Sequence, residues 1–139
     1  DYKLRWLDSL AVWVGEEMAK YPKLALCGDY NIAPDDRDVH DPKRWADCIL
    51  VSPPERAAFQ RFLGLGLSDS FRLFEQPEKT FSWWDYRMLG FQKNQGLRID
   101  HVLLSKPLAE KCTAAGVDRA PRKLERPSDH APVWAQIGG

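Results

Sequence analysis

The stretch PKLALCGDYN, residues 22–31, limits the fold most, because it encloses a short apolar run between a proline and a glycine. A run of this length between two chain breakers is typical of a strand that is covered on both faces. Cys27 lies inside the run and is therefore expected in the core. If the strand continues through Gly28, alternation brings the side chains of Asp29 and Asn31 to one face. The sequence thus predicts a buried strand that ends in two polar groups.

Helix and strand patterns alternate around this run. Apolar residues recur at helical spacing over residues 3–20, and SPPE opens a second helix with Ser52 as the cap and Glu55 closing a capping box. Without repeats or low complexity, this mixture predicts one domain of the α/β or α+β class. Strands are expected at residues 80–87, 97–104 and 133–137, loops at 33–48 and 90–96, and a short helix from Pro107.

The net charge of the 139-residue chain is zero, which argues against a strongly basic nucleic-acid-binding module. The charge is nevertheless uneven. Residues 29–41 carry five aspartates and one arginine, whereas residues 79–98 and 119–126 each have a balance of +3. An acidic patch beside two basic loops suits an anionic polymer that binds together with a divalent cation. Ordinary surface charge is the alternative that these counts leave open.

Cys27, Cys48 and Cys112 are odd in number and far apart in the chain. Neither a disulfide framework nor a zinc knuckle is therefore predicted, and a reducing, cytoplasmic compartment is expected. No apolar stretch approaches the ~20 residues that a membrane-spanning helix requires, so we expect no membrane partner.

Two further polar groups lie beside apolar strands. In the motif GLRID, Asp100 is expected at the edge of a buried sheet, where a carboxylate needs a partner. Arg98 lies on the same face by alternation and is one candidate, whereas His101 is expected to be a hydrogen-bonded core histidine. In the motif PSDHAPVW, Asp129 and His130 stand directly before a strand. An imidazole held by Asp100 would form a stable imidazolium, so His130 is the other candidate.

The segments GDYNIAPDDRDVHDP, TFSWWDYR, NQGLRIDHVLLS and RPSDHAPVW together resemble the exonuclease/endonuclease/phosphatase superfamily, and within it the exonuclease III-type abasic-site endonucleases. The resemblance runs from Trp6 to Ile137. It implies a four-layer α/β sandwich, in which two mixed β-sheets are flanked by helices. Residues 1–139 would form its C-terminal half, and the N-terminal half, with a metal-binding glutamate and a catalytic tyrosine, would be absent.

The resemblance also implies a function in base-excision repair. The chemistry would be Mg²⁺- or Mn²⁺-dependent hydrolysis of a DNA phosphodiester, at abasic sites of double-stranded DNA or from its 3′ ends. Asp29 would orient and deprotonate the attacking water, and Asn31 would hold that water or a phosphoryl oxygen. Asp100 would fix His130, whose protons stabilise phosphoryl charge. The metal-site carboxylates would be Asp129 and Asp29.

Contacts to DNA follow from the same resemblance. A pocket for a flipped-out abasic sugar would be small and apolar, although core packing is the alternative for its residues. Two other functions stay open: a superfamily phosphodiesterase acting on a phospholipid or inositol phosphate, and a non-catalytic fragment or DNA-binding half-domain. The pocket residues would be Trp83, Leu97 and Ile99, and the phosphate contacts Arg87, Lys93 and Arg98.

Overall fold

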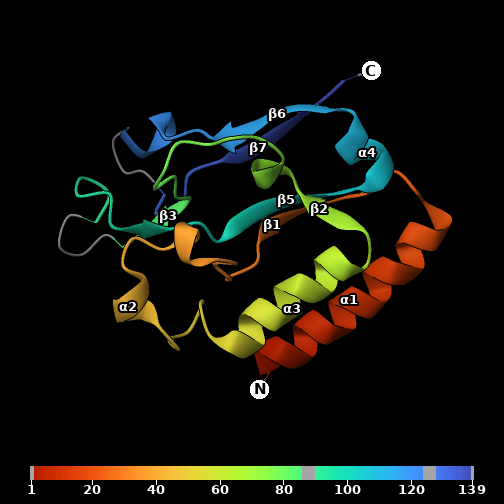
Figure 1. The fold of residues 1–139 in the computed structure, drawn as a ribbon, viewed down its shortest axis with the longest axis horizontal. Helices are drawn as coiled ribbons and strands as arrows, with labels where there is room; N and C mark the ends of the chain where they lie inside the picture. Colours follow the sequence, from red (N-terminus) through yellow and green to blue (C-terminus); the bar gives the residue numbers. More distant parts are fainter. Residues whose placement is uncertain (1, 86–89, 124–127, 139) are drawn as a thin grey trace.

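The computed structural model describes residues 2–85, 90–123 and 128–138 (Figure 1). Helices and strands both occur, which confirms the predicted α/β class. The elements are α1 (Tyr2–Lys20), β1 (Ala25–Asp29), η1 (Asp36–Asp38), α2 (Pro42–Trp45), α3 (Pro53–Gly64), β2 (Leu67–Asp69), η2 (Ser70–Leu73), β3 (Trp83–Trp84), β4 (Gly96–Leu97), β5 (Asp100–Ser105), α4 (Lys106–Glu110), β6 (Cys112–Val117), η4 (Ala120–Lys123) and β7 (Val133–Ile137).

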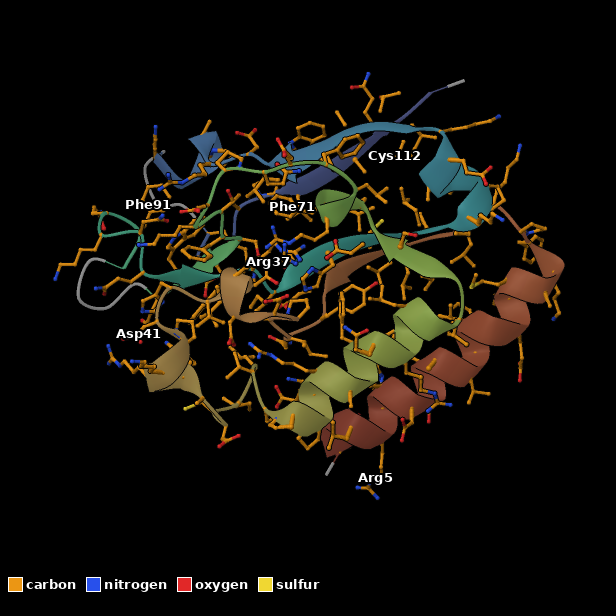
Figure 2. The ribbon with its side chains drawn as sticks, in the orientation of Figure 1. Arg5, Arg37, Asp41, Phe71, Phe91 and Cys112 are labelled. Carbon is orange, nitrogen blue, oxygen red and sulfur yellow. The ribbon has the colours of Figure 1, made fainter. Side chains whose placement is uncertain are left out.

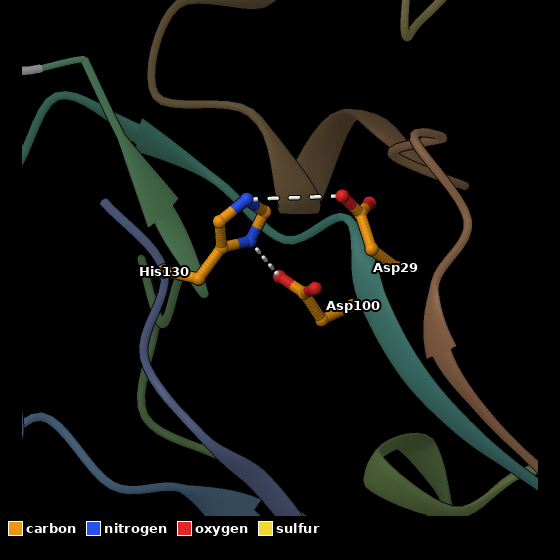
Figure 3. A group of neighbouring side chains, drawn as sticks. All are labelled: Asp29, Asp100 and His130. Carbon is orange, nitrogen blue, oxygen red and sulfur yellow. Dashed lines mark hydrogen bonds and ion pairs between the residues drawn. The ribbon is translucent and has the colours of Figure 1, made fainter. Parts of the chain in front are cut away.

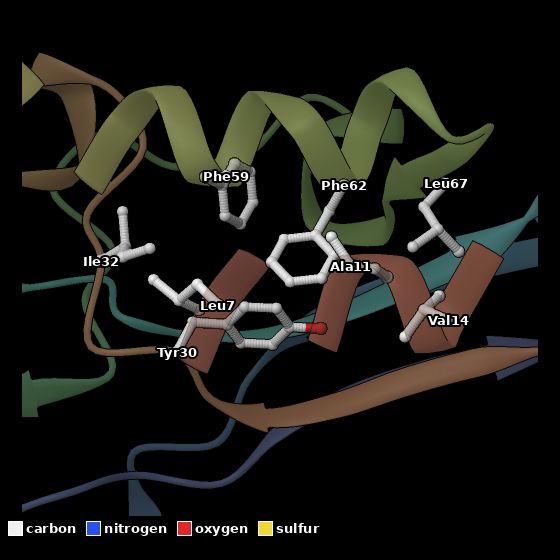
Figure 4. Packing of buried hydrophobic residues seen from close by; sticks show 9 residues of the cluster. Leu7, Ala11, Val14, Tyr30, Ile32, Phe59, Phe62 and Leu67 are labelled. Atoms are coloured by element: carbon white, nitrogen blue, oxygen red, sulfur yellow. The ribbon is translucent and has the colours of Figure 1, made fainter. Parts of the chain in front are cut away.

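The two long helices, α1 and α3, pack beside each other on one face of the central sheet (Figure 1). Their inward faces carry the helical-period apolar residues that the sequence predicts, and Figure 4 shows these side chains meeting Tyr30 from the end of β1. The ring of Phe62 lies edge-on to Tyr30, 5.8 Å between centroids. Aromatic and aliphatic burial of this kind is the main source of stability for such a layer.

The predicted capping box at the start of α3 does not form. Ser52 makes no side-chain hydrogen bond to the helix, and Glu55 is buried. A carboxylate in that position needs a cation, and Glu55 Oε2 lies 3.4 Å from Lys3 Nζ of α1. The glutamate therefore ties the two helices together rather than closing the end of its own.

The central sheet has the order β1–β5–β2, and both pairings are antiparallel. Its face toward α1 and α3 is covered, but Ala25 and Cys27 on the other face of β1 are exposed. The predictions that β1 is covered on both faces and that Cys27 lies in the core are therefore wrong, because helices cover one face only. Strand β2 was not predicted, since its three residues are too short to show a period.

The strand pair β6–β7 and the short pair β3–β4 complete the strands of the described residues, and both are antiparallel. Strand β7 lies where the sequence predicts it, whereas β6 was not predicted. In the expected strand 80–87, only β3 is extended, and residues 86–89 lie outside the described part. Within that part, no helix is both long and apolar enough to cross a membrane.

The expected strand 97–104 is divided into β4 and β5 by Arg98 and Ile99. Arg98 is 1% exposed, and its Nε donates to Asp38 Oδ1 at 2.7 Å while its Nη2 donates to Asp69 Oδ2 at 2.6 Å. Its guanidinium also stacks on the ring of Phe71, 4.6 Å from the centroid; Figure 2 labels Phe71. One buried cation thus joins three chain segments two residues before the start of β5.

Candidate active site

The register of the central sheet brings two carboxylates together. Asp29 is the last residue of β1 and Asp100 the first of β5, and the two are direct partners across the antiparallel pair. Partners on one face of such a pair lie about 5 Å apart at their Cβ atoms. Gly28 precedes Asp29 with φ +145°, a conformation that side-chain-bearing residues rarely adopt, and an added Cβ there would meet open space. Gly28 is therefore needed for the backbone conformation at this point, and Asp29 for the chemistry of its carboxylate.

His130 is carried to these carboxylates by the segment before β7. The backbone on both sides of it is fixed: Trp84 N donates to the Asp129 carbonyl at 3.2 Å, and Ala131 N donates to the Ser82 carbonyl at 2.8 Å. His130 itself forms an isolated bridge to Trp83. These main-chain contacts thus fix the backbone position of His130 independently of what its imidazole binds.

The imidazole of His130 lies between Asp100 and Asp29 (Figure 3). Its Nδ1 donates to Asp100 Oδ2 at 2.9 Å, and its Nε2 lies 3.7 Å from Asp29 Oδ2. Asp129 Oδ1 is 3.8 Å from the same Nε2. Arg98 is bonded to Asp38 and Asp69 instead, so His130 is the one of the two candidate partners that Asp100 binds.

Three carboxylates around one imidazole favour its protonated form. Burial alone would lower the pKa of His130, but the hydrogen bond and charge of Asp100 raise it above its ordinary value, and the charges of Asp29 and Asp129 add to this. Burial in turn raises the pKa of Asp100, whose side chain is 12% exposed, against the lowering effect of His130. The pair therefore holds a proton between its two groups more firmly than either group would alone.

Ser82 supports Asp100 and was not found by sequence reasoning. It is fully buried, and its Oγ accepts from the backbone N–H groups of Ile99 and Asp100, at 3.0 and 3.1 Å. A hydrogen bond between Ser82 and the Asp100 carboxylate also opposes the rise in the pKa of that group. The one sequence feature that could have indicated this role is the single serine inside the aromatic run TFSWW.

Asp129 lies beside His130 and is held by an indole. Trp83 Nε1 donates to Asp129 Oδ2 at 3.1 Å, and the Trp83 side chain is half-buried against Leu97 and its neighbours. The Asp129 carboxylate keeps 40% of its surface exposed. It is therefore oriented by one bond and open to solvent on its other side.

Asn31 does not continue the alternation of β1. Its φ is +54°, and its backbone N–H donates to Asp29 Oδ1 at 2.8 Å. This local hydrogen bond ends the strand at Asp29, so the expectation that alternation alone aligns the two side chains is wrong. The turn nevertheless orients the Asp29 carboxylate and leaves Asn31 exposed next to it in the chain.

Three of the expected DNA contacts are buried in the structure. Arg98 is bound by two internal carboxylates, and this corrects its assignment as a phosphate contact. Leu97 and Ile99 are 0% and 2% exposed and pack with Val39 and Val51, so in this structure they are core residues rather than an open pocket lining. Core packing is the alternative that the sequence analysis gave for these apolar residues.

The remaining expected DNA contacts lie on or near the surface. Lys93 is exposed, and Trp83 is half-buried at the site itself. Arg87 lies outside the described residues. A cavity of about 370 Å³ opens over the site and is bordered by Asp29, Asp100 and His130. This arrangement can hold an anionic group against the imidazole while leaving room for water.

The chain was compared with known proteins. Residues 1–130 match the model of the Endonuclease/Exonuclease/phosphatase family. Exodeoxyribonuclease III of Haemophilus influenzae is 42% identical over 97% of this chain and 53% of its own length. A 3′ phosphatase from Neisseria, NExo, solved with a product DNA hairpin, is 45% identical with a TM-score of 0.97 over 99% of this chain and 54% of its own.

An AP endonuclease from Archaeoglobus fulgidus is 34% identical, with a TM-score of 0.90 over 98% of this chain and 53% of that one. The chain thus spans about half the length of the curated relatives it matches. The family match covers most of the chain, including Asp29, Asp100 and His130. This chain belongs to the endonuclease/exonuclease/phosphatase family, and it resembles that family's exonuclease III-type members.

Proposed function

We propose that the chain is the half of a DNA phosphodiester hydrolase that carries its acid–base residues. The observation that supports this most directly is the position of His130 between Asp100 and Asp29, with Nδ1 bonded to the first and Nε2 facing the second. The activity would be that of an abasic-site endonuclease with 3′-to-5′ exonuclease activity. The relatives named as exodeoxyribonuclease III and AP endonuclease support this choice of substrate.

Asp29 is the residue best placed to act on the attacking water. Its Oδ1 is occupied by the Asn31 backbone N–H, whereas its Oδ2 faces the cavity side of His130. A carboxylate with one oxygen fixed and the other open can align a water and accept its proton. We assign the alignment to Asp29, with the exposed Asn31 amide as a second contact to the water or a phosphoryl oxygen.

His130 would stabilise charge on the phosphoryl group. Asp100 fixes Nδ1, so Nε2–H points away from the buried partner and is available to a non-bridging oxygen. A donor that is oriented in advance acts more strongly on charge that develops in the transition state than on the ground state. The raised pKa of His130 favours the form that carries this proton.

The donor set fits a hard divalent cation in part. Asp29, Asp100 and His130 have ligand atoms within 4.8 Å of one another, and Mg²⁺ prefers oxygen ligands and retains water. Since His130 already donates to Asp100, we assign Asp29 and Asp129 as the carboxylates that would hold Mg²⁺ or Mn²⁺. The cation would neutralise charge on the phosphate and its leaving oxygen when bound.

The DNA partner would be bound by groups around this site. We propose that exposed Lys93 contacts a phosphate, that Trp83 borders the sugar, and that Arg87 serves the same basic surface. The half that completes the relatives' length would supply the remaining metal ligands. We also propose a cytoplasmic location, because three free, widely separated cysteines suit a reducing compartment.

The test uses the chain combined with the N-terminal half of the Haemophilus relative, an abasic-site duplex and Mg²⁺. Asp29→Asn and His130→Gln should each lower kcat by about 10²–10³-fold while changing the Kd for DNA little. Lys93→Ala should weaken binding and reduce the slope of log K against log salt by about 1, whereas Gln92→Ala, its exposed neighbour, should do neither.

Equal losses of DNA affinity in Asp29→Asn, His130→Gln and Lys93→Ala would contradict the assignment, because the polar cluster would then be a contact surface only. Hydrolysis of a sphingomyelin or inositol phosphate substrate without cleavage of DNA would favour the other branch of the family instead.

A further inference from the structure

Two aromatic rings pack together on the face of β3 that points away from the candidate active site. Consecutive side chains of a strand point to opposite faces, so Trp84 turns away while its neighbour Trp83 binds Asp129. The indole of Trp84 is fully buried, and the ring of Phe91 lies edge-on to it with 5.0 Å between centroids. We call Trp84 and Phe91 the aromatic platform.

Arg119, from the segment between β6 and η4, lies over this platform. Its guanidinium carbon is 4.7 Å from the ring centroid of Phe91 and 5.5 Å from that of Trp84. Arg119 is nevertheless exposed, and within the described residues it forms no ion pair. The adjacent carboxylate of Asp118 accepts from Ala120 N at 3.0 Å instead. The face of the guanidinium is thus occupied by the rings, and its N–H edge is open to a partner.

A turn beside the platform places two lysines at its edge. Asn94 Oδ1 accepts from Trp84 Nε1 at 3.1 Å, and Asn94 Nδ2 donates to the Lys79 carbonyl at 3.0 Å. Asn94 and Lys79 have φ values of +53° and +56°, which residues other than glycine adopt uncommonly. Such conformations persist where the surroundings hold them, and they cluster at binding sites. Lys79 and Lys93, which precedes Asn94, are both exposed.

We propose that Arg119 binds a DNA phosphate that flanks the scissile one, with the aromatic platform as its support. Lys79, Lys93 and Arg119 come from three chain segments and border one platform, which suits a polyanion better than a single carboxylate. The planar fork of an arginine matches a phosphate, and stacking fixes its plane before binding. The inference rests on the proposed function, because it adds a contact to the same substrate.

One duplex can reach both the aromatic platform and the candidate active site. Trp84 N donates to the Asp129 carbonyl at 3.2 Å, so the two sites share one main-chain contact at β3. Duplex DNA carries about one negative charge per 1.7 Å of its axis, so several phosphates lie near any scissile one. Arg119 therefore acts on the affinity and position of the DNA, whereas the chemical step belongs to His130 and Asp29.

Equilibrium binding tests the contact, with the chain combined with the N-terminal half of the Haemophilus relative, here called the assembly. The probes are abasic-site duplexes of two different sequences, in EDTA to prevent cleavage. Arg119→Ala should raise the Kd several fold on both duplexes and reduce the slope of log K against log salt by about 1. Arg119→Lys keeps the charge without the stacked fork, so it should keep the slope and lose part of the affinity. Arg5→Ala, an exposed arginine of α1 far from Phe91 (Figure 2), should change neither quantity.

A double-mutant cycle tests the support that the platform gives. Phe91→Leu should weaken DNA binding when Arg119 is present and have little further effect in Arg119→Ala. The urea midpoint of Arg119→Ala should stay close to that of the unsubstituted chain, because a cation–π contact at an exposed site adds little stability. Equal losses from Phe91→Leu in both backgrounds would contradict the role of the platform, since the ring would then act without Arg119.

The outcomes separate this inference from the proposed function. If Arg119→Ala binds DNA as tightly as Arg5→Ala while Lys93→Ala still weakens binding, the Arg119 contact is wrong and the proposed function stands. If Arg119→Ala instead prevents the two halves from combining, as sedimentation would show, its partner is a group of the other half and the contact is again wrong. Absence of DNA binding by the unsubstituted assembly at every salt concentration would contradict both.

Discussion

The residues on either side of the His130 ring favour its protonated form and raise its pKa. Asp100 is hydrogen-bonded to one nitrogen, and Asp29 and Asp129 face the other. Charge at 2.9 Å with a direct bond acts more strongly than charge near 4 Å across solvent-accessible space. The contribution of each carboxylate can therefore be separated by removing one at a time.

We predict that Asp100→Asn lowers the pKa of His130 far more than Asp129→Asn does. The first change removes the charge of the group that accepts the Nδ1–H bond and leaves at most a neutral amide oxygen as acceptor, whereas the second removes only a charge that lies 3.8 Å from Nε2. Nitrogen-15 chemical shifts of the imidazole, followed through a pH titration, measure both values. Equal shifts in the two variants would mean that charge alone, and not the hydrogen bond, sets the protonation.

His101 is the opposite case, a histidine that the fold keeps neutral. Its Nδ1 lies 3.1 Å from a guanidinium nitrogen of Arg98, which only donates, and its Nε2 lies 2.8 Å from the Ile32 carbonyl oxygen, which only accepts. The tautomer with its proton on Nε2 satisfies both. Burial, followed by the charge of Arg98, lowers the pKa of His101 to about 4. This matches the predicted core histidine.

The two histidines should make stability greatest near pH 6.5. Below that pH the unfolded chain protonates His101 and the folded chain does not, so the free energy of unfolding falls on acidification, by about 3 kcal/mol in total near pH 4. His130 acts in the other direction: its raised pKa stabilises the fold below pH 6.5, and this is lost as the pH rises through the folded value.

Urea unfolding from pH 4 to pH 8 measures this profile. In His101→Gln the free energy of unfolding should no longer fall as steeply below pH 6.5, and in His130→Gln it should no longer fall as steeply above pH 6.5. Each variant should keep the pH dependence on the other side. An acidic slope that persists unchanged in His101→Gln would assign it to a different group.

Among the elements, the break between β4 and β5 determines what the site contains. Because Arg98 turns inward there, it pairs with Asp38 and Asp69, and Asp100 is left to His130. Burial alone would lower the pKa of Arg98, but the charges of Asp69 and Asp38 raise it, so the guanidinium stays charged. The buried ion cluster of Arg98, Asp38 and Asp69 thus lies next to the candidate active site and stabilises the chain segments around it.

Arg98→Leu should destabilise the fold by about 3–5 kcal/mol, because it leaves the carboxylate of Asp69 without the cation bonded to it and the buried carboxylate of Asp38 with Arg72 alone. Arg61→Ala is the matched control: it breaks an ion pair to Asp8 whose partners are 46% and 64% exposed, and should cost at most about 1 kcal/mol. Urea midpoints of the two variants give the comparison. Similar losses would show that water reaches the Arg98 cluster.

Long periodic elements and short motifs were predictable from the sequence, whereas long-range pairing was not. Helix α1 and strand β7 lie where their apolar spacing places them. Arg98, by contrast, does not bind Asp100 because it is bonded to Asp38 and Asp69. Those aspartates are separated from Arg98 by 60 and 29 residues, and no local pattern marks them as its partners. Ser82 was missed because the main-chain groups that it binds lie 17 and 18 residues away, and β2 because its three residues are too short to show a period.

At the scale of the whole molecule, strand β1 of the central sheet is covered by α1 and α3 on one face and exposed on the other. We propose that a further layer completes the sandwich, because residues of β1 are exposed and the chain spans about half the length of the relatives it matches. This layer would also bring a further metal-binding carboxylate.

The chain alone should therefore be a poor nuclease. With Mg²⁺ and an abasic-site duplex, residues 1–139 should cleave at least about a thousandfold more slowly than the same chain combined with an N-terminal half from the Haemophilus relative, since two partly exposed carboxylates do not fix a hard cation. Gel analysis of product formation measures both rates. Comparable rates from the lone chain would contradict the half-domain interpretation.

The pairing of β1 with β5 has a consequence for synthesis on the ribosome. Asp29 and Asp100, which end the register, are 71 residues apart, so β1 waits for its partner while roughly 4–14 s of translation pass at ~5–20 residues per second. During that interval a nascent apolar strand presents unpaired main-chain groups to any neighbouring polypeptide. Slow codons between residues 30 and 100 should therefore increase misassembly, whereas slow codons after residue 105 should not.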